Sequence, residues 1–245
     1  MPLESLLSAV SSASAEPPST LIEAAYRQIR RDIVLGVHPP GERLRIEQLK
    51  TRYAASSGTL REALALLVSD DLVVAQGQRG FSVAPMSLED LTDLSYVRSL
   101  VEAEAARQSL LRGDDDWEAR LVSAFHKLTR TEERLAARTA DVYEEWELRN
   151  FEFHEALVSA CGSPRLLSLR AMLHLQAERY RRVSALSGPR PGSVHAEHEQ
   201  IFTLALARKG DALAEVIGQH VRRSLDVIRN SGLLSARAQD GGEAA

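Results

Sequence analysis

The sequence predicts a mainly α-helical fold with a small N-terminal domain and a larger C-terminal bundle of helices. Three observations support this. The 245 residues are enough for one large domain or two modest ones. Alanine, leucine and arginine are frequent while aromatic residues make up 5%, a composition that favours helices. Short β-type segments occur only near residues 72–85, so any sheet is small and close to the N-terminus.

The two ends of the chain are predicted to be tails. Residues 1–18 are rich in Ser, Ala and Pro and contain no Lys or Arg, so they lack the basic start of a signal peptide. Residues 233–245 are predicted to fray. No apolar run approaches the roughly 20 residues that span a bilayer. The single cysteine, Cys161, excludes an intramolecular disulfide and fits a reducing compartment. We therefore expect a cytoplasmic protein with no membrane partner.

Residues 19–85 are predicted to form the N-terminal domain. Thr20 is a suitable N-cap for its first helix and Gly36 a suitable stop. The expected order is a helix over 20–35, a turn at "VHPPGERL", short helices over 46–53 and 58–70, and β segments over 72–76 and 80–85. Two short helices joined by a tight turn and followed by a hairpin make a winged helix-turn-helix.

Residues 86–232 are predicted to form an all-helical domain. Its first helix opens with a capping box, Ser87 followed by Asp90. Breaks at "RGDDDW", "CGSPR", "SGPRPGS" and "RKGD" divide the rest. The expected helices are 88–111, 115–138, 141–160, 164–186, 193–208 and 211–231.

The helix that begins near Gly58 has the residue types that a DNA groove requires. Small residues at its start allow close approach, and the unpaired amides of a helix start suit a phosphate oxygen. Ser56 and Thr59 add hydroxyl groups, and Arg61 adds a forked donor one turn later. Taken alone, this helix fits better a solvent-capped surface helix with an incidental arginine. The net charge of −4 decides nothing, because the local face determines affinity for a polyanion.

The whole segment resembles the DNA-binding domain of GntR-family bacterial transcription regulators. Four motifs carry the resemblance over about residues 20–85: "PGERL", "REAL", "LV" and "RGFSV". It implies DNA contacts from Arg43, Arg45, Ser56, Ser57, Thr59, Arg61, Gln78, Arg79 and Gly80. Ser57 stands where many members have an arginine, and Gly58-Thr59 replaces the common Thr-Pro. The chain therefore lacks a guanidinium that could pair with a guanine edge.

Three histidines of the C-terminal domain are candidate metal ligands. His154 shares a helix face with Asn150, and His198 and His220 lie on two further helices. Side chains from separate helices can converge in a bundle core and bind a divalent ion. By spacing alone, each histidine is more often a partly buried polar residue.

Residues 88–232 resemble the FCD effector domain of the FadR subfamily, through Asn150 before "FH", "EH" before "GD", and a final "H". The resemblance implies a divalent metal, zinc by preference, on Asn150, His154, His198 and His220, beside a small carboxylate effector. Asn150 stands where an aspartate is common. The likeness is greatest to the carbon-starvation-induced repressor branch, which senses short dicarboxylates. His126, His174 and His195 match no motif position and are expected to be structural.

Three more residues are candidates for effector binding. Arg98 matches the arginine that points into the pocket of this family. It either binds an effector carboxylate through two hydrogen bonds or pairs with Glu102 one turn later, and the sequence leaves both open. Arg179 and Tyr180 are further candidates for the lining of the pocket.

The sequence thus predicts a transcription regulator, a repressor released from DNA by a small carboxylate. A homodimer is expected, because two recognition helices double the contacts on a near-palindromic operator. Two other classes stay open: a metal-dependent enzyme built on the histidines, and a winged-helix module that binds protein.

Overall fold

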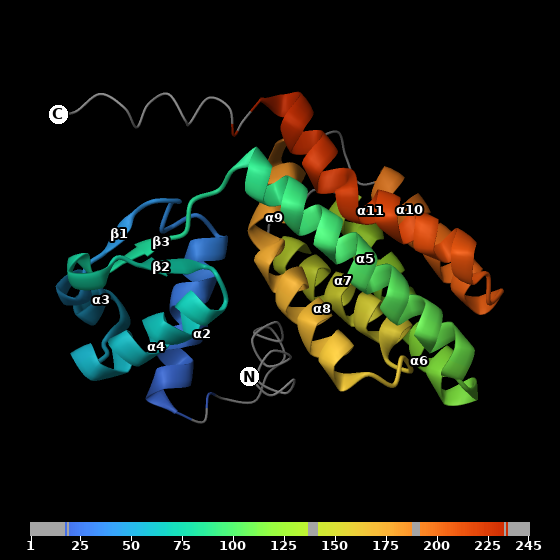
Figure 1. Ribbon diagram of the computed structural model, residues 1–245, viewed down its shortest axis with the longest axis horizontal. Coiled ribbons are helices and arrows are strands. Elements are labelled where there is room, and N and C mark those ends of the chain that lie inside the picture. Colours follow the sequence, from blue (N-terminus) through green and yellow to red (C-terminus); the bar gives the residue numbers. More distant parts are fainter. Residues whose placement is uncertain (1–17, 19, 137–141, 188–191, 233, 235–245) are drawn as a thin grey trace.

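A computed structural model describes residues 18, 20–136, 142–187, 192–232 and 234. The predicted tails, residues 1–18 and 233–245, fall largely outside this part of the chain. The described chain forms a small N-terminal domain and a larger helical domain, joined between strand β3 and helix α5 (Figure 1).

The N-terminal domain is built on three helices. They are α2 (Leu21–Val34), α3 (Ile46–Tyr53) and α4 (Ser57–Ser69). The Thr20 hydroxyl accepts a hydrogen bond from the Glu23 amide at 3.1 Å, which confirms the predicted cap. Between α3 and α4 the chain reverses through Ala54, whose φ of 49° is left-handed. Apolar side chains of all three helices form one core.

The wing is a three-stranded antiparallel sheet in the order β1-β3-β2. Its elements are β1 (Arg43–Leu44), β2 (Val73–Ala75), the 3₁₀ turn η1 (Gly77–Arg79) and β3 (Phe81–Val83). The hairpin β2–β3 follows the prediction. Strand β1 was not predicted; it pairs Arg43 with Ser82, so the proline-rich turn ends as a sheet edge.

The helical domain contains seven described helices. They are α5 (Leu88–Arg112), α6 (Asp115–Ala136), α7 (Val142–Val158), α8 (Pro164–Gln176), α9 (Glu178–Ser187), α10 (Gly192–Leu206) and α11 (Gly210–Ser231). Ser87 caps α5 by accepting from the Asp90 amide at 3.0 Å, as the capping box predicts. Helices α5 and α11 lie side by side along the length of the domain (Figure 1).

The predicted single helix over 164–186 is wrong, since α8 and α9 are separate helices that break at Ala177. The break frees the His174 carbonyl, and the Arg181 guanidinium satisfies it at 3.0 Å. A side chain thus replaces a backbone hydrogen bond, and no glycine or proline marks the place in the sequence.

Apolar packing in the helical domain has two centres. One core joins α5, α6, α7, α10 and α11 around Trp117 and Phe153, and the other joins α5, α8, α9 and α11 around Tyr180 and Ile228. The domain also buries a group of ionisable side chains from α5, α7 and α8, which we call the buried layer: Arg98, Glu102, His154, Arg170 and His174. Within the described residues, no helix is long and apolar enough to cross a membrane.

Candidate nucleic-acid interface and metal centre

The start of α4 is a well-formed helix terminus that faces solvent. The Ser56 hydroxyl accepts from the Thr59 amide at 3.1 Å and lies 2.9 Å from the Thr59 hydroxyl. Leu60 and Leu64 are fully buried behind it, while Gly58 and Arg61 are exposed. The cap and the core therefore fix a helix whose first turn presents Gly58 and Arg61 outward.

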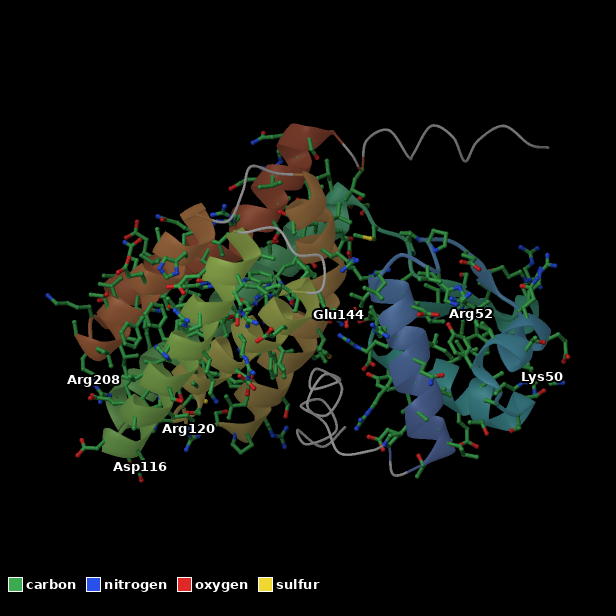
Figure 2. The ribbon with its side chains drawn as sticks, turned by 180° about the vertical axis from the view of Figure 1, so that it is seen from behind. Lys50, Arg52, Asp116, Arg120, Glu144 and Arg208 are labelled. Atoms are coloured by element: carbon green, nitrogen blue, oxygen red, sulfur yellow. The ribbon has the colours of Figure 1, made fainter. Side chains whose placement is uncertain are left out.

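Four arginines of this domain are exposed and make no ion pair with any described residue. They are Arg43, Arg45, Arg61 and Arg79. The domain's other basic side chains are paired, Lys50 with Glu47 and Arg52 with Asp32 among them. Lys50 lies at the end of the molecule far from the helical domain, whereas Arg52 reaches Asp32 on α2 (Figure 2). These four exposed arginines are the arginines among the predicted DNA contacts.

The wing tip has two glycines with positive φ, Gly77 at 56° and Gly80 at 87°. Gly80 has a φ of 87° and a ψ of −136°, a conformation that L side chains rarely adopt, and its carbonyl accepts from the Gln76 amide at 2.8 Å. The backbone of the wing therefore requires a glycine at position 80, independently of any contact with DNA. The same turn holds Arg79 in an exposed position. The side chain of Gln78 lies outside the described part of the structure.

Three helices bring the predicted histidines together. Ring nitrogens of His154 on α7, His198 on α10 and His220 on α11 lie within 4.8 Å of one another. His154 and His198 are buried, and Asn150, one turn before His154, is also buried. Helices far apart in the chain thus converge, as the resemblance to the FCD domain implies.

Carboxylates orient two of these rings. The Nδ1 atom of His198 lies 2.7 Å from a Glu132 oxygen, and Nδ1 of His220 lies 2.9 Å from a Glu197 oxygen. A carboxylate only accepts, so each Nδ1 carries the proton and each Nε2 keeps a free lone pair. His195 donates to the same Glu132 at 2.8 Å, so it supports this arrangement although no motif marks it.

The histidine site has the chemistry of a divalent-metal site. His198 Nε2 and His154 Nδ1 are buried without a hydrogen-bond partner in the described structure. Burial, followed by the charges of His220 and His198, holds the pKa of His154 well below its usual range. Burial also lowers the pKa of His198. Burial therefore favours the neutral form of His154 and His198, the form that binds a metal.

The charge missing at Asn150 is supplied nearby. Glu102 is buried, and its carboxylate lies 3.8 Å from Nδ1 of His154. Burial raises its pKa, but Arg98 and Arg170 outweigh that effect and keep the pKa below its usual range. Glu102 is thus ionised beside the histidines. The sequence predicts Glu102 only as a possible partner for Arg98.

Arg98 has the internal partner that the sequence left as one alternative. Its Nη2 lies 2.5 Å from a Glu102 oxygen, and both side chains are buried. Arg170, not predicted, is fully buried near Glu102 at 3.9 Å and pairs with Glu155. Its Nε and Nη2 make no hydrogen bond with a described residue, and burial lowers its pKa to about 10. A buried guanidinium with unused donors suits an anion.

The structure does not bring Arg179 and Tyr180 to Arg98. Arg179 donates to the Ala84 carbonyl at 2.9 Å, and the Tyr180 hydroxyl donates to Asp90 at 2.6 Å. These side chains hold the linker between the domains, because α9 turns toward it after the break at Ala177. Arg179 and Tyr180 therefore lie at the linker and not beside Arg98, where the pocket lining was expected.

Helix α9 connects the buried layer to the N-terminal domain. Arg181, on α9, lies 2.9 Å from Glu147 and 3.1 Å from Nε2 of His174. One turn earlier Glu178 pairs with Arg30 on α2. Glu144 on α7 pairs with Arg31 at 2.9 Å and faces the same helix (Figure 2). His174, expected to be structural, thus belongs to this layer.

Comparison with known proteins gives matches over both domains. Residues 93–223 match the FCD domain family, and residues 21–83 match the bacterial regulatory proteins of the gntR family. The HTH-type transcriptional regulator BphR of Paraburkholderia xenovorans (strain LB400) is 46% identical over 88% of each chain. The HTH-type transcriptional repressor GlaR of Escherichia coli (strain K12) is 36% identical over 84% of this chain and 94% of its own.

Solved structures share the fold. E. coli McbR/YncC has a TM-score of 0.66 at 18% identity, over 90% of this chain and 99% of its own. A putative GntR regulator from Rhodococcus sp. RHA1 has a TM-score of 0.61 at 24% identity, over 91% and 99%. The two sequence relatives are named as a transcriptional regulator and a transcriptional repressor, which favours regulation over a metal-dependent enzyme.

Proposed function

The chain belongs to the GntR family of bacterial regulatory proteins and carries an FCD domain, and from this we propose that it is a repressor released from its operator by a small carboxylate. It is a DNA-binding transcription regulator and not an enzyme. The observation that carries the proposal is the set of four exposed, unpaired arginines around the start of α4 and the wing. We expect it to act as a homodimer on a near-palindromic operator, in the cytoplasm.

The DNA contacts follow from the geometry of the N-terminal domain. The exposed first turn of α4 would enter the major groove, where Arg61 can donate to a base edge or a phosphate. Arg79 on the wing, and Arg43 and Arg45 beside strand β1, would contact the backbone. Such contacts position the domain and make its affinity depend on salt, unlike the binding of a protein partner.

His154, His198 and His220 would hold the metal, with the Asn150 amide oxygen as a candidate fourth ligand. Zinc fits three imidazole nitrogens at such a site. A bound divalent ion would supply positive charge at the centre of the domain. Glu132 and Glu197 would keep two of the rings in the metal-binding tautomer.

The effector would bind in the buried layer beside the histidines. Arg170 offers unused donors there, and Arg98 could exchange Glu102 for an effector carboxylate. Two guanidinium groups at one buried site suit an acid with one or two carboxylates, a short dicarboxylate included.

Release from DNA would pass through α9. Arg181 on this helix lies 3.1 Å from His174 in the buried layer, and Glu178 on the same helix pairs with Arg30 of the N-terminal domain. An effector that binds better when α9 has shifted would change how the two winged helices are held. Only that difference in affinity can move the DNA equilibrium.

The test uses a labelled duplex that the wild-type protein selects from a randomised pool. Arg61→Ala should weaken binding about 10-fold to 100-fold by fluorescence anisotropy, because one base or phosphate contact is lost. Arg52→Ala is the matched control, since Arg52 already pairs with Asp32. Equal affinities for wild type and Arg61→Ala would contradict the assignment of α4.

The same complex tests the effector. Mono- and dicarboxylates are added with and without zinc, and one of them should both release the duplex and raise the melting temperature of the free protein. Arg170→Met should remove this response and leave DNA binding intact. A screen in which no carboxylate does either would end the small-acid proposal while the DNA assignment stands.

A further inference from the structure

A cavity lies between the two domains, where helix α2 meets the helical domain. Its lining comes from α2 on one side and from α7, α8 and α9 on the other. Glu144 lies on the helical-domain side of this boundary and faces α2 (Figure 2). The described residues that line the cavity include neither the predicted metal ligands nor Arg98 and Arg170. The cavity is therefore separate from the histidine site and from the guanidinium groups proposed for the carboxylate effector.

Positive charge exceeds negative charge in the lining of this cavity. Five arginines line it, namely Arg27, Arg30, Arg31, Arg181 and Arg182, against three carboxylates, namely Glu144, Glu147 and Glu178. Each of the three carboxylates already pairs with one of these arginines, in the pairs Arg30–Glu178, Arg31–Glu144 and Arg181–Glu147. Arg27 pairs with Glu23 on its own helix. The lining thus has no described carboxylate left for its fifth arginine.

Arg182 on α9 is that fifth arginine. It makes no ion pair with a described residue, and its guanidinium carbon lies 5.2 Å from the centre of the Tyr143 ring. A guanidinium that lies over an aromatic ring donates no hydrogen bond to a carboxylate there, so its N–H groups stay available to a ligand. Arg182 therefore gives the cavity an unneutralised positive charge.

Two buried side chains of the lining also carry N–H groups that lack an acceptor. Arg30 is 5% exposed, and its Nε has no hydrogen-bond partner in the described structure. His174 is 2% exposed, and its Nε2 lies 3.1 Å from the Arg181 guanidinium. A guanidinium only donates, so the proton of His174 is on Nδ1, which also has no partner among the described residues. Buried donors of this kind are costly unless an acceptor reaches them.

We propose that this cavity binds a small organic phosphate. A phosphate monoester carries a charge of about −1.5 to −2 near pH 7 and has three strong acceptor oxygens. It can accept hydrogen bonds from several arginines at once, whereas one guanidinium fork already satisfies the two oxygens of a carboxylate. The excess of arginines and the buried donors therefore favour a phosphate over a carboxylate at this place.

The rest of the lining suits an apolar group attached to the phosphate. Val34, Leu148 and Leu175 line the cavity and are buried, and the Tyr143 ring lies beside Arg182. A free phosphate ion would leave these apolar side chains unused. The ligand class is thus an ester with a compact apolar body.

The ligand would contact both domains. Arg30 and Arg31 belong to α2, and Arg182 belongs to α9. A molecule that bridges them binds best when α2 rests on α9, so it would favour the described arrangement of the two domains. The site would give the protein a second input that is separate from the histidine site.

Phenyl phosphate, a dianion with an apolar ring, is the probe for this site. Calorimetry on the full-length wild-type protein should find saturable binding, and inorganic phosphate should bind at least 10-fold more weakly because it lacks the ring. Arg31→Ala and Arg182→Ala remove one donor from each domain and should each weaken phenyl phosphate about 10-fold. The Arg31 side chain is 58% exposed and Arg182 is partly exposed, so both variants should melt as the wild type does.

Arg130→Ala is the matched control. Arg130 is 67% exposed on α6, outside the cavity, and pairs with exposed Glu133, so its loss should leave phenyl phosphate binding unchanged. An equal loss in this variant would mean a general charge effect and would overturn the site. Wild-type protein that does not bind phenyl phosphate, or binds inorganic phosphate as tightly, would also overturn the proposal. Arg170→Met should keep phenyl phosphate binding, so failure of this site is distinguishable from failure of the carboxylate site.

Discussion

In the N-terminal domain four arginines are exposed and lack an ion pair with any described residue, whereas in the helical domain Arg98 and Arg170 are buried against carboxylates. An exposed arginine costs folding little and stays available to a polyanion. A buried arginine is costly unless it is paired, so a chain that keeps one with unused donors has a reason beyond stability. Arginine is thus suited to bind a polyanion when it is exposed on the N-terminal domain, and a small anion when it is buried in the helical domain.

The largest test of this contrast is stability. Arg98→Ala should lower the free energy of unfolding by about 3–5 kcal/mol, because it leaves Glu102 buried without its partner. Arg61→Ala, the matched exposed arginine, should change it by less than about 0.5 kcal/mol. Urea unfolding followed by circular dichroism measures both. Similar values for the two variants would remove the distinction between the domains.

The carboxylates of the helical domain should matter for metal binding. Glu132→Gln should weaken zinc affinity about 10-fold to 100-fold, since the amide no longer fixes the His198 tautomer. Glu133→Gln changes the next residue of the same helix, which pairs only with exposed Arg130. Isothermal calorimetry should therefore find the Glu133→Gln protein unchanged; equal losses would mean a general charge effect.

The buried layer should also make the helical domain sensitive to acid. Burial, followed by the charge of Arg181, lowers the pKa of His174 well below its usual range. In the unfolded chain the imidazole takes up a proton below about pH 6.5, so stability is present above that pH and is lost as the pH falls toward the folded pKa.

His174→Gln should therefore remove about 2 kcal/mol of the stability lost between pH 7 and pH 5 in metal-free buffer. Thermal or urea unfolding at the two pH values measures it. His126→Gln replaces an exposed histidine and should leave the pH dependence as it is. A His174→Gln protein as acid-sensitive as wild type would show that the layer is hydrated.

The smallest effect concerns salt. Arg79→Ala should lower the slope of log affinity against log salt by about one, because one phosphate contact is lost. Arg52→Ala should lower it less, since Asp32 already neutralises that guanidinium. Anisotropy titrations from about 50 to 200 mM salt measure both slopes. A larger change for Arg52 would mean that pairing within the protein does not decide which arginines reach DNA.

Local signals predicted the elements that depend on local chemistry. The Thr20 and Ser87 caps and the start of α4 follow from residue type and spacing. The convergence of the three histidines was expected only from the family resemblance, because spacing alone favoured partly buried polar roles. Strand β1 was missed because two residues carry too little pattern to predict a strand. Its existence depends on pairing with β3, far along the chain.

The rest of the site depends on contacts between distant residues. The break between α8 and α9 is held by Arg181 and the His174 carbonyl, and no breaking residue marks it. Arg170 sits in an ordinary helical run, so only the fold reveals that it is buried near Glu102. Arg179 and Tyr180, candidates for the pocket lining, instead bond to Ala84 and Asp90 near the linker, because they follow the turn at Ala177.

Helix α2 links the two domains in a way that lets DNA specificity and effector specificity evolve separately. The Tyr26 hydroxyl donates to Asp70, at the end of α4, and Arg30 one turn later pairs with Glu178. Because α2 and α4 share one core, a shift of α9 would move the whole DNA-binding domain as a rigid body. Operator specificity and effector specificity can then change independently in evolution. A chimaera joined at the linker should take its operator from one parent and its effector from the other.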